Sequence, residues 1–225
     1  MLGAALVCVA SPRLASATVL TFEGISALPI ADIPDGYGGM VWHDVLGPTD
    51  NPFRIIDGAT VFPAGSGYQN GAVSPDYVAF NPSFATATVR DSEHFDFTGA
   101  YITAAWRQGL EVTVKGFRDG GLVALQTVVV DALAPTVPTD FLTFDFLDID
   151  KLVFESACPA ATCSDLFVGT VNSGNQFAMD NFTFEVTSAP EPGPSLLLAL
   201  CGLALAGSRR LRAPGSPGRG RTRKI

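Results

Sequence analysis

Apolar and polar residues alternate with a period of two in the middle of the chain. Between residues 110 and 116, Leu110, Val112 and Val114 occupy one set of positions, and charged or hydroxyl side chains occupy the other. This alternation is typical of an antiparallel strand that places one face on a core and the other in solvent. An Arg-Asp-Gly-Gly turn at 118–121 leads into a second apolar segment at 122–130. The pattern therefore predicts a β-hairpin over 110–130.

Similar short segments recur through most of the chain, separated by turns rich in glycine and proline, and no stretch of this body shows a sustained helical period. Further strands are predicted at 18–22, 40–45, 77–80, 87–90, 101–106, 141–144, 151–155 and 177–186. Without crossover helices a parallel sheet is not expected. We predict an all-β domain over residues 18–187, an antiparallel β-sandwich of jelly-roll type, with Trp106 in its core.

The two ends of the chain predict an exported protein. Residues 1–10 are apolar, and Ala15-Ser16-Ala17 is the small-residue pattern of a signal-peptidase site, so residues 1–17 are predicted to be a signal peptide. No basic residue precedes the apolar run, which makes the signal atypical or places the true translation start upstream.

The segment 188–212 has three parts in a fixed order. Pro190, Glu191 and Pro192 come first, an uncharged apolar run of thirteen residues follows at 195–207, and the segment ends in a cluster formed by Arg209, Arg210 and Arg212. A full membrane span needs about 20 residues, so the predicted apolar helix is short and suggests a transient anchor in the inner membrane. The arginines predict a cytoplasmic end. Residues 213–225 are predicted to be a disordered basic tail.

These three parts together resemble the PEP-CTERM sorting tail of exported Gram-negative proteins. The resemblance implies recognition by exosortase, a membrane protease, often in bacteria that make exopolysaccharide. The chain continues thirteen residues beyond the arginines, which departs from the usual pattern. The body also resembles a recurrent β-sandwich domain found with such tails, in the stretches 21–24, 33–42, 100–106 and 177–182.

The charge of the domain argues against some classes of partner, and its cysteine content bears on the cellular compartment. Residues 18–187 contain 21 acidic and 6 basic side chains, a net charge of −15, which should repel nucleic acid. Of the four cysteines, only Cys158 and Cys163 fall within this domain, five positions apart. In an exported domain that spacing predicts a local disulfide that pins a loop.

A calcium site is predicted at the last strand. The apolar positions change phase between Met179 and Phe182, and a β-bulge absorbs such a slip. Asp180 and Asn181 lie at the slip, and Glu23 would join them if the first and last strands pair. These oxygens, completed by backbone carbonyls and waters, are ligands that calcium accepts. The alternative is that these side chains form only hydrogen bonds at the bulge and bind no metal. A similar arrangement in jelly-roll carbohydrate-binding modules often holds a structural calcium.

Function is less constrained than location. The two histidines, His43 and His94, have no zinc-ligand spacing, and the sequence contains neither a nucleophile elbow nor a phosphate loop. Tyr37, Trp42 and Tyr68 are candidates for stacking on sugar rings, and the glycine-rich surroundings of the two tyrosines favour their exposure. We predict a structural or adhesive protein of the envelope or extracellular matrix. The alternatives are a glycan-binding module associated with exopolysaccharide and a carbohydrate-active enzyme.

Overall fold

A computed structural model describes residues 16–43, 53–62, 64–82, 86–132, 140–165 and 174–187. Ala15–Thr187 form one compact unit, which encloses the domain predicted over 18–187. The sorting tail, the apolar run at 195–207, the basic tail and all but the last two residues of the predicted signal peptide lie outside the described residues. No helix among those described is both long enough and apolar enough to span a bilayer.

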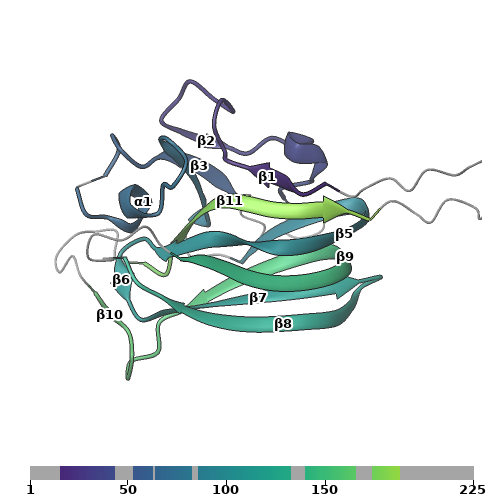
Figure 1. The fold of residues 1–225 in the computed structure, drawn as a ribbon. Coiled ribbons are helices and arrows are strands. Elements are labelled where there is room, and N and C mark those ends of the chain that lie inside the picture. The colour runs from purple at the N-terminus through teal and green to yellow at the C-terminus, as the bar shows by residue number, and fades with distance from the viewer. Residues whose placement is uncertain are drawn as a thin grey trace, which may run out of the picture. The chain divides into compact units, whose positions relative to one another are not determined.

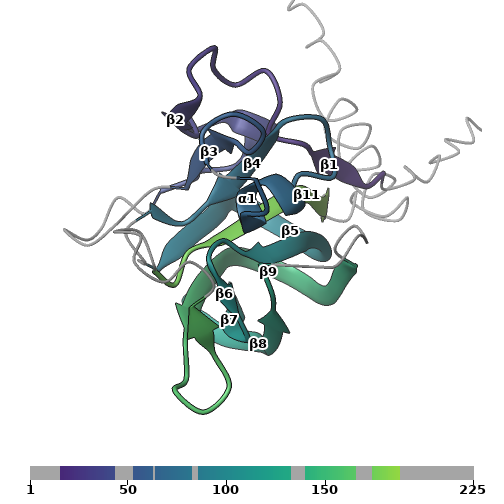
Figure 2. The same ribbon diagram turned by 90° about the vertical axis from the view of Figure 1, so that its left-hand side faces the viewer.

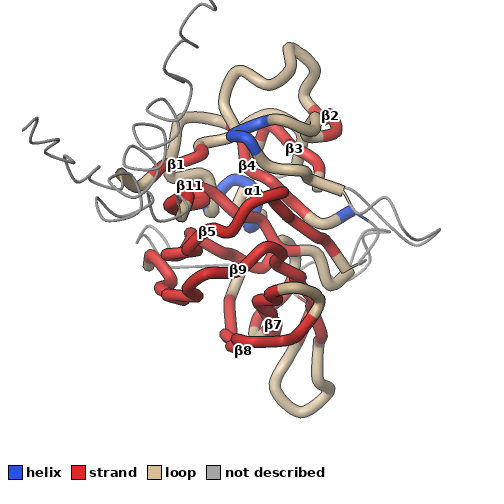
Figure 3. The backbone as a smooth tube through the Cα atoms, turned by 90° about the vertical axis from the view of Figure 1, so that its right-hand side faces the viewer, coloured by secondary structure: helices blue, strands red, loops and turns tan. Residues whose placement is uncertain are grey.

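Strands make up most of the described chain, and its helical segments are single short turns (Figure 3). Two of these helical turns are η1 (Tyr37–Gly39) and α1 (Gly67–Asn70). The strands are β1 (Thr18–Leu20), β2 (Ile30–Asp32), β3 (Arg54–Asp57), β4 (Tyr77–Phe80), β5 (Ala87–Ala104), β6 (Arg107–Gln108), β7 (Leu110–Arg118), β8 (Gly121–Val130), β9 (Phe141–Ala157), β10 (Ser164–Asp165) and β11 (Phe177–Val186).

All described strand pairs are antiparallel. The main sheet has the order β2-β3-β4-β11-β5-β9-β7-β8, and β1 also pairs with β11 (Figure 1). The predicted all-β antiparallel class and the predicted hairpin over 110–130 are confirmed, and the fold is sandwich-like. The jelly-roll type is a finer assignment and stays a prediction.

Some strand predictions differ from the structure. Segments 30–32 and 54–57 pair with each other as strands although their short apolar runs gave no clear signal. Of the strand predicted at 40–45, Val41 forms only an isolated bridge to Arg90, and residues from 44 onward lie outside the described part. The polar stretch 91–94, which lies between the strands predicted at 87–90 and 101–106, belongs to the 18-residue strand β5.

An aromatic cluster fills the main core. Phe97 packs against Phe182 at a ring-centroid distance of 4.8 Å and against Phe144 at 5.3 Å, so it joins three strands of the sheet. Phe53, which precedes β3, packs edge to face on Phe154 of β9 at 5.5 Å. This contact brings one end of the sheet over its middle and gives the fold its layered character.

A second, smaller cluster lies on the other face of β3, β4 and β11. Figure 2 shows the short helix α1 beside β4 and β11. Tyr68 of α1 packs on Phe80 of β4 and on Trp106, with centroids 5.5 and 5.3 Å apart. Trp106 is buried, as predicted, but it belongs to this cluster and not to the one that contains Ile102. The chain turns over after β5 ends at Ala104, which exchanges the two faces.

The predicted disulfide is present between Cys158 and Cys163, whose Cα atoms are 5.2 Å apart. It closes the loop between β9 and β10. Strand β10 then pairs with β6 in a separate two-stranded sheet, where Arg107 and Asp165 form an ion pair of 3.2 Å.

Replacing Phe97 should unfold the domain more readily than replacing an exposed apolar residue. Phe97→Ala leaves a cavity among several rings, so we expect a loss of about 3–5 kcal/mol in the free energy of unfolding. The control is Leu147→Ala in β9, whose side chain is 65% exposed and should cost less than about 0.5 kcal/mol. Urea unfolding followed by tryptophan fluorescence measures both, and equal losses would contradict this picture of the core.

Candidate functional site

The first and last strands pair, as the calcium prediction required. Leu20 of β1 lies opposite Phe182 of β11. The register of β11 against β5 shifts between Asp180 and Thr183, and Asn181 has a φ of +51°. A β-bulge is therefore present at the predicted position, and it allows apolar side chains on both sides of the slip to face the core.

Asp180 is fully buried and is held by hydrogen bonds. Its Oδ2 accepts from the backbone N–H groups of Val73 at 2.8 Å and Ser74 at 2.7 Å, and from Ser74 Oγ at 2.8 Å. Its Oδ1 accepts from the backbone N–H of Asn181 at 2.7 Å. These donors satisfy a buried carboxylate, which would otherwise be very costly to desolvate.

Glu23 accepts hydrogen bonds from the residues that follow Val73 and Ser74 in the chain. Its Oε1 accepts from the backbone N–H groups of Asp76 at 3.0 Å and Tyr77 at 2.8 Å. The two carboxylates thus fasten residues 73–77, which lead from α1 into β4, to the turn after β1 and to β11. This arrangement supports hydrogen bonding as their role. Asn181 Oδ1 is buried without a hydrogen-bond partner, and calcium at Glu23, Asp180 and Asn181 stays a prediction.

Burial dominates the electrostatics of this region. Desolvation raises the pKa of Asp180, although hydrogen bonds from Ser74, Asn181 and Val73 oppose the shift. Desolvation also raises the pKa of Tyr37, and the nearby negative charges of Glu23 and Asp180 add to it. The Tyr37 hydroxyl accepts a hydrogen bond of 2.9 Å from the backbone N–H of Phe22.

The aromatic residues predicted to stack on sugar rings are buried or half-buried among apolar neighbours. Trp42 is completely buried, and its Nε1 donates to the carbonyl oxygen of Tyr37 at 2.8 Å. Tyr68 is 2% exposed, with its ring stacked on Phe62 at 4.9 Å, and burial raises its pKa. Tyr37 is half-buried against Phe22. The expected exposure is wrong for Tyr68, because its glycine-rich loop folds inward over apolar neighbours, whereas Tyr37 keeps part of its surface exposed.

A different polar cluster lies at one end of the sheet. In β5, Arg90 pairs with Lys151 of β9 and Phe95 pairs with Ile149, so the four residues 91–94 oppose the single residue Asp150. The extra residues arch away from the ladder and carry His94 to its place beside Asp150. Asp119 arrives from the β7–β8 turn, where its φ of +50° and that of Gly120 at +78° suit a tight two-residue turn.

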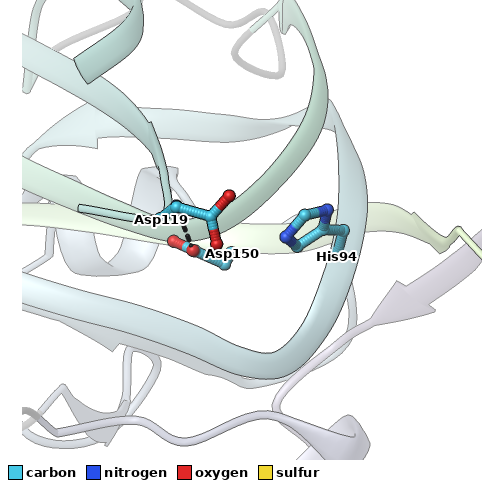
Figure 4. A group of neighbouring side chains, drawn as sticks. All are labelled: His94, Asp119 and Asp150. Carbon is cyan, nitrogen blue, oxygen red and sulfur yellow. Dashed lines mark hydrogen bonds between the residues drawn. The ribbon is translucent and has the colours of Figure 1, made fainter. Parts of the chain in front are cut away.

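Figure 4 shows His94 with one ring nitrogen directed toward the two aspartates. One ligand atom from each of His94, Asp119 and Asp150 lies within 4.8 Å of the other two. Asp150 Oδ2 also accepts a hydrogen bond of 2.6 Å from the Asp119 backbone N–H. The three side chains belong to an open pocket of about 290 Å³, whose wall also includes Arg90, Asp91, Ser92, Gly120 and Lys151.

The other ring nitrogen of His94 is already engaged. His94 Nδ1 lies 2.8 Å from Asp148 Oδ1, and Arg118 forms an ion pair of 2.7 Å with the second oxygen of the same carboxylate. The backbone N–H of Asp148 donates to Asp96 Oδ1 at 2.6 Å. Asp148 sits at another register shift with a φ of +54°, so a bulge in β9 aims it at the histidine.

Sequence analysis missed this cluster because its members are 25 and 31 positions apart. The alternation of β9 gave one available signal, since Asp148 and Asp150 share a parity with buried Phe146 and Leu152. Carboxylates at positions that should face the core indicate a β-bulge, where the regular alternation of the strand breaks. The sequence could not tell which histidine would meet them.

Comparison with known proteins adds fold information alone. The sequence matches no protein-family model, and no curated protein matches it significantly. Among solved structures, a DUF4465 family protein from Bacteroides caccae is similar with a TM-score of 0.51 at 13% sequence identity. The similarity covers 76% of this chain and 100% of the Bacteroides chain. It supports the β-rich, sandwich-like fold.

Removing the Asp180 side chain should destabilise the domain strongly. Asp180→Ala leaves the buried N–H groups of Val73 and Ser74 without an acceptor, so we expect a loss of about 3 kcal/mol in the free energy of unfolding. The matched control is Glu185→Ala, an acidic residue five positions along the same strand, expected to change stability by less than about 0.5 kcal/mol. Urea titrations measure both, and a loss below about 1 kcal/mol for Asp180→Ala would contradict the fastening role.

The raised pKa of Asp180 gives a pH dependence with a defined sign. Below the pKa of an unfolded aspartate, about 3.9, the carboxyl is protonated in both states. Between that pKa and the higher folded pKa, the unfolded chain has released the proton while the folded protein still holds it, so the folded protein loses stability relative to an uncharged variant until the pH passes the folded pKa. The free energy of unfolding of wild type minus that of Asp180→Asn should therefore fall as the pH rises above about 3.9 and then level off. A difference that grows with pH would show that hydrogen bonds outweigh burial.

Proposed function

We propose that this chain is an exported cell-envelope or extracellular-matrix protein that exosortase sorts by its C-terminal tail, and that the β domain has a structural or adhesive role. One observation carries the proposal. The last strand ends at Val186, and the Pro190-Glu191-Pro192 motif, the apolar run and the arginine cluster follow within the next 26 residues. A folded domain is thus followed at once by a segment with the order of a sorting tail.

Two features of the domain support this location. The Cys158–Cys163 disulfide suits an oxidising compartment outside the cytoplasm. The net charge of −15 over residues 18–187 suits a soluble exported domain and opposes nucleic-acid binding. The partners in this proposal are exosortase, the inner membrane during transit, and exopolysaccharide in the matrix.

The geometry favours the structural or adhesive role over its alternatives. A glycan-binding module of the stacking type needs exposed aromatic faces, and Trp42 and Tyr68 lie in the two cores. A glycoside hydrolase needs two carboxylates that face each other across a cleft. Asp119 and Asp150 instead lie against each other, linked by a hydrogen bond from the backbone of one to the side chain of the other.

Processing of the tail tests the sorting proposal. In a host that contains an exosortase, we expect the exported wild-type protein to lack Arg219–Ile225 when its intact mass is measured. Glu191→Gln should retain the whole tail and accumulate in the membrane fraction. The control Glu185→Gln changes an acidic residue just before the motif and should be processed like the wild type. Wild-type protein that is exported with Arg219–Ile225 still attached would refute sorting by this tail.

A further inference from the structure

We propose that His94, Asp119 and Asp150 form a binding site for a divalent first-row transition metal of the zinc type. The site is separate from the calcium site predicted at Glu23, Asp180 and Asn181. Within the part of the chain that the structure describes, these three are the group of histidine, cysteine and acidic side chains whose ligand atoms converge. The proposal concerns the folded domain and does not depend on how the tail is processed.

Three separate segments supply one ligand each, which is how a metal site forms without a local motif. The bulge at 91–94 in β5 carries His94, the β7–β8 turn carries Asp119, and β9 carries Asp150. Neighbouring ligands of a tetrahedral zinc ion lie about 3.4 Å apart, since each bond is about 2.0–2.2 Å long. The observed limit of 4.8 Å therefore needs at most about 1.4 Å of closure. The exposed Asp119 side chain has the freedom to supply it.

Asp148 prepares the imidazole for a metal. An imidazole whose Nδ1 donates to a carboxylate keeps its lone pair on Nε2, and metal-binding histidines commonly have such an outer carboxylate. His94 and Asp148 have this relation at 2.8 Å. Arg118 holds Asp148 through its ion pair and through bonds to the carbonyl oxygens of Asp148 and Leu147. This support is independent of the three ligands and fixes the ring that faces the aspartates in Figure 4.

The donor set selects the class of metal. Calcium takes oxygen ligands, whereas an imidazole nitrogen with two carboxylates suits zinc, manganese, iron or nickel. Three protein ligands leave a coordination position for water, and the pocket is open to solvent. Arg90 and Lys151 in its wall weaken cation binding. The ammonium of Lys151 is directed to the ring of Phe117, 4.6 Å from the centroid, where a cation–π contact holds it.

Bound metal would join three strands at the end of the sheet. The hydrogen bond between the Asp119 backbone and Asp150 already links the turn to β9, and the metal would add the bulge to this link. A ligand that binds only the folded state raises the unfolding temperature. We therefore expect zinc to stabilise the domain as well as bind to it.

Isothermal titration of the full chain with zinc chloride tests the site. We expect wild type to bind one zinc ion at this site, and expect His94→Gln, Asp119→Asn and Asp150→Asn each to weaken it at least about tenfold. Asparagine tolerates the left-handed conformation at position 119, so Asp119→Asn keeps the turn intact. Circular dichroism and the unfolding temperature without metal establish that each variant is folded.

The second histidine of the chain provides a matched control. His43 Nδ1 lies 3.0 Å from Asp35 Oδ1, so it also has a carboxylate partner, but the described residues place no second acidic ligand with it. His43→Gln should bind zinc like the wild type. The thiols of Cys8 and Cys201 are unchanged in both histidine variants, so any zinc that they take up cancels in the comparison. Equal zinc binding by His94→Gln and His43→Gln would overturn the proposal.

Two further measurements separate a true site from loose charge attraction. Asp148→Asn, a change of the positioning residue, should weaken zinc binding by about tenfold while leaving one site per chain. Calcium chloride should bind wild type and His94→Gln equally, if it binds at all. Zinc should raise the unfolding temperature of wild type and of His43→Gln but not of Asp119→Asn. Calcium binding that depends on His94, or no zinc-dependent shift in wild type, would refute the assignment.

Discussion

The period of two along a β-strand is the constraint on which this structure depends. A strand with one face in a core must keep its apolar side chains on that face, and each extra residue reverses the faces of all that follow. The long pair β5 and β9 has unequal numbers of residues between matching apolar positions. Local bulges absorb the difference, and the rings of Phe95, Phe97, Phe146 and Phe154 all remain in one core.

The same constraint places several acidic and amide side chains of the domain at its β-bulges. A bulged residue leaves the ladder and often needs a left-handed backbone, which aspartate and asparagine tolerate better than most residues. Asp145, Asp148 and Asn181 have positive φ angles at register shifts. Two groups of acids result. The one around Asp180 is buried and fastens a loop, and the one around Asp150 opens to solvent beside His94.

Burial decides what each group can do. Asp180 has no exposed surface, and backbone and hydroxyl donors occupy both of its oxygens, so its side chain stabilises the fold through hydrogen bonds to the segment 73–77. Asp119 is exposed and the pocket around it is open, so its carboxylate has access to solutes. Aromatic residues that the sequence led us to expect at the surface are largely covered instead, because large rings gain more free energy from burial than a loop loses by folding inward.

The sequence by itself determined the β class, the hairpin over 110–130, the bulge after Met179 and the disulfide, because each follows from neighbours within a few positions. It also carries the tail motif on which the proposed location rests. Only the tertiary structure decided that Tyr68 of α1 packs on Trp106, that Glu23 and Asp180 fasten residues 73–77, and that His94 meets Asp119 and Asp150. Those contacts join positions 25 to 107 residues apart. Local periodicity fixes which face a residue occupies, whereas strand order and register fix which distant residue it meets.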